Sequence, residues 1–67
     1  MKEELFLSKS EFRILRLVNA GLSNQEIANR LQITVGTAKW HMHRIFAKLH
    51  VRNRTAAAAK ARALGLW

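Results

Sequence analysis

The sequence predicts an all-α fold of four helices, because its composition and its capping signals both indicate helices. Good helix formers dominate the 67 residues, proline is absent and only three glycines occur, which favours helices over a sandwich or barrel. Four capping side chains each precede a stretch of apolar residues at helical spacing. The chain is short and lacks cysteine, so one core held by packing alone is expected. We therefore expect residues 1–67 to form a single domain.

The first helix is expected over residues 9–20. Ser8 and Glu11 have the spacing of a capping box, in which each side chain accepts a hydrogen bond from the backbone N–H of the other residue. Gly21 ends the helix, since glycine readily adopts the left-handed conformation common at helix C-termini.

A short second helix and a longer third helix are expected over residues 24–31 and 35–49. Ser23 and Glu26 repeat the capping box, and Thr34 caps the third helix after a very short turn. A supporting helix followed by a short helix, a tight turn and a longer helix is the layout of a helix-turn-helix.

The last helix is rich in alanine and is expected over residues 54–64. Asn53 precedes it as the capping residue, and Gly65 follows it as the terminator. The chain is thus expected to consist of four helices joined by short turns.

The third helix divides into three stripes when its residues are placed at about 100° per position. The apolar stripe should pack on the first two helices and consists of Ala38, Met42, Ile45 and Leu49, with Phe46 beside it. The opposite side carries Gly36, Lys39, Trp40, His43 and Ala47. The flank between them carries Thr37, His41, Arg44 and Lys48.

The positive charge of the chain is concentrated in its second part. The net charge is +8, all four acids lie within the first 26 residues, and only lysines and arginines follow from Ile27 onward. A polyanion is the expected partner; nucleic acid is the commonest, an anionic membrane is the next, and a merely solvated basic surface is the third possibility.

The stripes of the third helix match what a recognition helix needs in the major groove of double-stranded DNA, namely a central row that reaches base edges and a flanking row that reaches phosphates. Lys39 can donate to guanine acceptors, His43 can donate or accept, and Trp40 suits a thymine methyl group. These three residues are the predicted base contacts. The predicted phosphate contacts, on the flank, at helix N-termini and in the following basic segment, are Asn24, Thr34, Thr37, His41, Arg44, Lys48, Arg52 and Arg54. Arg54 has an alternative role, which is to pair with Glu11 inside the domain.

Functions other than DNA binding are compatible with parts of the sequence. Trp40 could instead pack at an interface, so that its face or the last helix docks another protein; RNA polymerase is a candidate partner for such a surface. Attachment of the last helix to a membrane, helped by Leu66 and Trp67, is a weaker alternative because its alanine face is only slightly apolar. Two histidines two positions apart on a helix do not share a metal. An enzyme is not expected, because no nucleophile has a matched base, and neither a cofactor nor a small-molecule ligand is expected in this domain.

The sequence resembles the DNA-binding domain of LuxR-type bacterial regulators, and the segments Lys39–His41 and Ala61–Leu66 look most like the C-terminal domains of large MalT-like regulators. The residues that carry the family resemblance are Leu7, Ser8, Glu11, Gly21–Asn24, Glu26–Ala28, Leu31, Ile33, Thr34, Thr37, Lys39, His41, Ile45, Lys48, Leu49, Val51, Arg54 and Thr55.

This resemblance implies sequence-specific promoter binding in the bacterial cytoplasm, with base contacts near Lys39, Trp40 and His43 and a homodimer on inverted or direct half-sites. It also implies a domain excised from a longer transcription regulator, such as a response regulator. Family members commonly dimerise through the last helix, which makes Ala56, Ala59 and Ala63 candidates for the dimer interface.

Three residues depart from the family pattern. Ser10 stands where arginine is usual, Ala38 where valine is usual, and His50 where glycine is common. Ala38 leaves room that Met42 or Phe46 can fill. His50 indicates a turn that does not require a left-handed residue.

Overall fold

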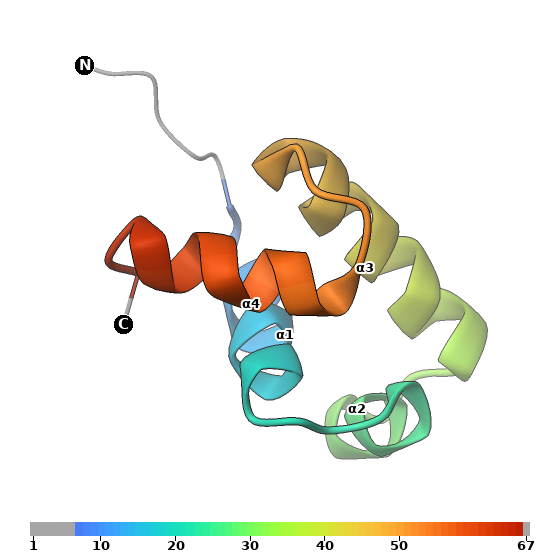
Figure 1. Cartoon of the computed structure of the whole chain (residues 1–67). Helices are drawn as coiled ribbons and strands as arrows, with labels where there is room; N and C mark the ends of the chain where they lie inside the picture. The colour runs from blue at the N-terminus through green and yellow to red at the C-terminus, as the bar shows by residue number, and fades with distance from the viewer. Residues whose placement is uncertain (1–6, 67) are drawn as a thin grey trace.

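The computed structural model describes residues 7–66, and this part of the chain contains four helices and no strand. The helices are α1 (Lys9–Asn19), α2 (Asn24–Leu31), α3 (Val35–Leu49) and α4 (Arg54–Ala63). Helix α1 packs against each of the other three helices, and α2 also packs against α3. In Figure 1, α4 crosses α1, while α2 and α3 follow each other around one side of the molecule. The predicted all-α fold is confirmed.

All four predicted capping residues begin their helices. The Ser8 hydroxyl accepts the N–H of Glu11 at 3.1 Å and the Glu11 carboxylate accepts the N–H of Ser8 at 2.9 Å, and Ser23 and Glu26 form the same box at 3.1 and 2.8 Å. These boxes satisfy backbone donors that the first turn of a helix leaves unpaired. Side-chain oxygens also cap the remaining two helices, those of Thr34 and Asn53.

Two helices end one residue earlier than predicted. Ala20 and Leu64 are the C-cap residues of α1 and α4, and the left-handed glycines follow them, with φ of 92° at Gly21 and 70° at Gly65. The glycines therefore stop the helices as predicted, but each cap residue already lies outside its helix.

The expectation about His50 was wrong. His50 has φ 59° and ψ 43°, which is the left-handed region, and Gln32 at the end of α2 has nearly the same conformation. The reversal lets the N–H of Val51 bond to the carbonyl of Phe46 at 2.9 Å and places Val51 against the core. Side chains other than glycine thus occupy left-handed positions at the ends of both helices of the motif, at some conformational cost.

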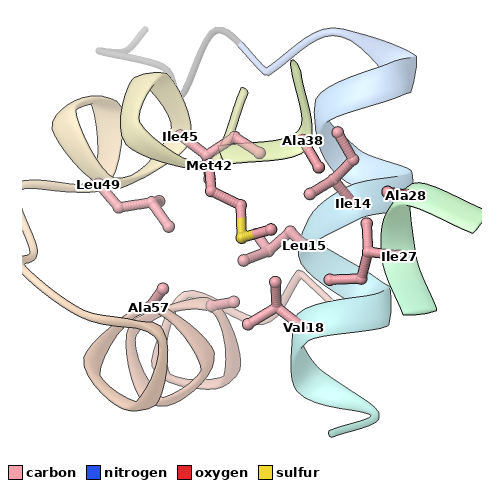
Figure 2. Packing of buried hydrophobic residues seen from close by; sticks show 11 residues of the cluster. Ile14, Leu15, Val18, Ile27, Ala28, Ala38, Met42, Ile45, Leu49 and Ala57 are labelled. Carbon is pink, nitrogen blue, oxygen red and sulfur yellow. The ribbon is translucent and has the colours of Figure 1, made fainter. Parts of the chain in front are cut away.

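The core lies between the four helices (Figure 2). Its buried apolar residues are Ile14, Leu15, Val18, Ile27, Ala28, Ala38, Met42, Ile45, Leu49, Ala57 and Ala61. The predicted apolar stripe of α3 is therefore buried as expected, and Phe46 packs beside it while partly exposed. Helix α4 contributes only two alanines, which allows its backbone to approach α1 and α3 closely.

None of the helices in the described range is long and apolar enough to cross a membrane. Of the two residues proposed to help a membrane attachment, Leu66 packs against the core and Trp67 lies outside the described residues.

Candidate nucleic-acid interface

The side of α3 opposite the core is open to solvent. Trp40 is 56% exposed and is one of two large exposed apolar residues in the described chain, and Lys39 and His43 are exposed as well. The three predicted base contacts thus point away from the core, as a groove-reading role requires. We call this face, made of Gly36, Lys39, Trp40, His43 and Ala47, the reading face.

Two positions of the reading face carry little or no side chain. Gly36 and Ala47 are both exposed, and the nearest atom to a Cβ built on Gly36 would be the Thr34 hydroxyl oxygen at 3.9 Å. Nothing among residues 7–66 therefore requires glycine at this position. A bare backbone here can approach another molecule closely.

Lys39 and His43 lie toward one edge of the reading face. They line a shallow hollow of about 150 Å³ together with Met42, Phe46, Asn24 and Arg54. The N-termini of α2 and α4 meet α3 at this hollow, so residues distant in sequence surround one space. Its polar members offer two cations, an imidazole and an amide, groups that bind phosphates or base edges.

Arg54 is held by groups of the domain itself. Its Nη1 donates to the Leu22 carbonyl oxygen at 2.6 Å and its Nη2 to Asn24 Oδ1 at 3.2 Å. The guanidinium thus ties the start of α4 to the start of α2. Asn24 and Arg54 were both predicted to contact phosphates, and the structure brings them together as hydrogen-bonding partners; their contact with DNA stays a prediction.

A buried carboxylate meets the opposite flank of α3. Glu11 is 5% exposed; Lys48 Nζ donates to its Oε1 at 2.7 Å, and Arg44 Nε lies 3.8 Å from its Oε2. Burial raises the pKa of Glu11, but the hydrogen bonds from Lys48 and from the Ser8 N–H, with the charges of Lys48 and Arg44, outweigh burial and lower the pKa overall. Glu11 is therefore a charged residue in the folded protein near neutral pH.

The suggested pairing of Arg54 with Glu11 was wrong, because each of the two residues has other partners. Lys48 and Arg44 occupy the carboxylate, and Arg54 reaches the start of α2 instead. Sequence reasoning missed the pairing, although a signal existed: Glu11 shares one face of α1 with Ile14, Leu15 and Val18, and a charged residue on an apolar face needs a buried partner.

The remaining predicted phosphate contacts lie at the start of α3, along it and just after its end. Thr34 and Thr37 are exposed and are joined by a 2.9 Å hydrogen bond between their hydroxyls, and Arg52 is exposed after α3. His41 is half-buried and lines a hollow of about 170 Å³ with residues of α1, among them Ser10 and Arg13. The contact of these four residues with DNA remains a prediction.

A helix-turn-helix supported by α1, with an exposed basic surface on its second helix, defines the class of this protein. The family model described as bacterial regulatory proteins of the luxR family matches residues 5–61. The chain belongs to this family of transcription regulators, whose helix-turn-helix domains bind DNA rather than catalyse reactions.

Individual relatives agree with this assignment. The chain is 42% identical over 65 residues to the HTH-type transcriptional regulator AlkS of Ectopseudomonas oleovorans, a match that covers 97% of this chain and 7% of that protein. It is 48% identical over 56 residues to the transcriptional regulatory protein LnrK of Bacillus subtilis, covering 84% of this chain and 26% of LnrK.

A solved structure has the same fold. The crystal structure of the response regulator ChrA from a heme-sensing two-component system superimposes with a TM-score of 0.90 at 42% identity, over 98% of this chain and 33% of the ChrA chain. The chain therefore spans only a small part of the length of the regulators that it matches.

Proposed function

We propose that this domain binds double-stranded DNA in a sequence-specific manner, with α3 in the major groove, as the effector domain of a bacterial transcription regulator. The observation that carries the proposal is the exposure of Lys39, Trp40 and His43 on α3 opposite its buried stripe. A helix so divided can insert its outer side into the groove while its inner side stays anchored to the domain.

The charges around the reading face support this docking. Arg44 on α3 and Arg52 just after it are exposed, and each phosphate that such a residue neutralises releases counterions and strengthens binding. Asn24 and Thr34 stand at helix N-termini, where backbone N–H groups favour an anion. The proposed split is base reading by Lys39, Trp40 and His43 and positioning by the residues around them.

The proposal includes a homodimer on two half-sites. Ala59 and Ala63 are exposed on α4 and Ala56 is half-buried. Because these side chains are small, a second copy of the helix can approach α4 closely. Sedimentation of the domain with and without duplex DNA tests this assembly, and Ala59→Glu should reduce it if α4 forms the contact.

A binding-site selection from random duplex DNA tests the base contacts. The parent domain should select a defined motif, and Lys39→Ala and His43→Ala should each change or relax the preference at particular positions. A bidentate hydrogen-bonded pair between a side chain and a base contributes about 1–3 kcal/mol of discrimination, which sets the size of the expected effect. Arg16→Ala is the matched control, since Arg16 is exposed on α1 and lies outside the reading face.

Identical motifs from the parent and both reading-face variants would refute the base-reading role. Weak binding indifferent to sequence, measured by titration of labelled duplexes at moderate salt, would instead favour the alternative in which the Trp40 face or α4 docks a protein. That outcome would contradict the proposal as a whole.

A further inference from the structure

We propose that Glu11, a residue of α1 beneath the recognition helix, acts as a positioning residue for base recognition by holding Arg44 against the ring of Trp40. This inference rests on the proposed function, because it assigns a determinant of specificity to the same interface. It extends that interface to a buried carboxylate that cannot itself reach DNA.

Glu11 contacts two residues of α3. Glu11 is the one buried charged or polar residue in the described chain, and its two oxygens face two different cations of α3. Oε1 receives Lys48 Nζ at 2.7 Å, and Oε2 faces Arg44 Nε at 3.8 Å. The position of the carboxylate is also set from its own helix, since Oε1 accepts the Ser8 N–H at 2.9 Å.

Arg44 in turn contacts the ring of Trp40. The Arg44 Cζ atom lies 4.9 Å from the centroid of the Trp40 ring, within the range of a cation–π interaction. The guanidinium thus faces the carboxylate through Nε and the indole through its π-contact. A rigid planar group in this position connects the buried oxygen to the reading face.

The orientation of the Trp40 indole depends on the side chains that contact it. Trp40 is 56% exposed, so the core does not fix its rotamer. Apart from Arg44, its ring contact within the described chain is with the half-buried His41, at 5.1 Å between centroids and 70° between planes. Ordering a mobile side chain on binding costs free energy, and a ring already oriented in the free protein avoids that cost. Glu11 and Arg44 therefore prepare Trp40 for the base that it contacts.

The two capping boxes supply a matched pair of variants. Glutamine replaces glutamate in natural capping boxes, so Glu11→Gln keeps the cap of α1 and removes the charge that attracts Arg44. Glu26→Gln makes the same change in the box of α2, where the carboxylate is exposed and accepts from Ser23. Both variants lose one negative charge, and only Glu11→Gln alters the contact with α3.

The first readout is the environment of Trp40 in the free protein. In a Trp67→Phe background, where Trp40 is the only tryptophan, acrylamide quenching should increase in Glu11→Gln and stay at the parent value in Glu26→Gln. Arg44→Lys should also increase quenching, because it retains the charge but loses the planar group. This second variant tests the same connection without touching α1.

The second readout is discrimination between the selected DNA site and single-base variants of that site. Glu11→Gln and Arg44→Lys should each reduce the ratio of affinities by about two- to fivefold at the base pair that Trp40 contacts, whereas Glu26→Gln should not. Unchanged quenching and unchanged discrimination in both variants would overturn the inference. If the parent showed no sequence preference, the proposed function would fail, and the quenching result would still decide whether Glu11 orients Trp40.

Discussion

Gly36 is a glycine that the described part of the fold does not require. It lies in the first turn of α3, where glycine is a weak helix former, and the surroundings of its Cα are open apart from one ordinary contact with Thr34. A side chain would fit within the domain. The glycine therefore makes sense if DNA approaches the backbone at this point.

Gly36→Ala separates stability from binding. The free energy of unfolding should rise, by at most about 0.5–1 kcal/mol, because alanine loses less backbone entropy than glycine in a helix. Affinity for the selected DNA should fall, because the new methyl group stands on the proposed contact surface. Urea unfolding followed by circular dichroism and a duplex titration measure the two effects, and tighter DNA binding would contradict close approach at this residue.

Glu11 gives the stability of the domain a dependence on pH. Its pKa is lowered in the folded protein from its ordinary value of 4.5, so the unfolded chain binds more protons and stability rises with pH through this range. The stabilisation is complete above about pH 4.5 and is lost as the pH falls through the lowered pKa of the folded state.

Glu11→Gln should therefore flatten the acid side of the stability profile. At pH 7 the variant should lose about 1–2 kcal/mol, since the contact of Lys48 with a buried charge is removed while Lys48 can still reach water. Thermal unfolding between pH 3 and pH 7, at about unit steps and constant salt, measures the change. The Glu26 carboxylate also has a lowered pKa, caused by its hydrogen bonds with Ser23, so Glu26→Gln serves as the comparison. If stability depended on pH as steeply in Glu11→Gln as in the parent, the result would contradict the assigned ion pair.

At the scale of helices, α4 shows how a sequence of small residues acquires two different sides. Ala57 and Ala61, four positions apart, are fully buried, whereas Ala59 and Ala63 are exposed. The alanines look alike in the sequence, and only docking of the helix against α1 and α3 distinguishes them. A large side chain should therefore have opposite consequences on the two sides.

Ala57→Leu should destabilise the domain by about 1–3 kcal/mol, because the added atoms overpack a filled core. Ala59→Leu should change the unfolding free energy by less than about 0.5 kcal/mol, as surface substitutions usually do. Denaturant unfolding of the two variants provides the comparison. Equal stabilities would mean that α4 is rotated relative to the packing described above.

At the scale of the whole molecule, the charge is high and its location matters more than its sum. The net charge of +8 attracts any polyanion. Only a cation that contacts a phosphate, however, adds the full amount of one contact to the salt dependence of the affinity. Arg44 is exposed beside the reading face, whereas Arg16 lines a hollow between α1 and α2 with Arg13, Leu17 and Arg30.

Arg44→Glu and Arg16→Glu change the net charge equally and so separate these effects. Arg44→Glu should weaken binding to all duplex sequences and reduce the slope of log affinity against log salt by about 0.9, the value for one phosphate contact. Because it also removes the contact of Arg44 with Trp40, it should reduce discrimination at the base pair that Trp40 contacts as well. Arg16→Glu should leave the slope nearly unchanged. The same slope in both variants would show that the flank of α3 does not contact the backbone of DNA.

The sequence by itself determined the four helices, their caps and the buried stripe of α3, because these features depend on neighbours three or four residues away. It also distinguished the reading face, since exposure follows from the same periodicity. The sequence did not predict the left-handed conformation of His50, because that conformation goes with the packing of Val51 against the core.

Only the tertiary structure decided which charged groups meet. The pairing of Glu11 with Lys48 and that of Arg54 with the start of α2 join residues at least 30 positions apart, and their distances depend on how the helices cross. Local periodicity specifies which side of a helix a residue occupies, whereas the packing of complete helices specifies what that side touches.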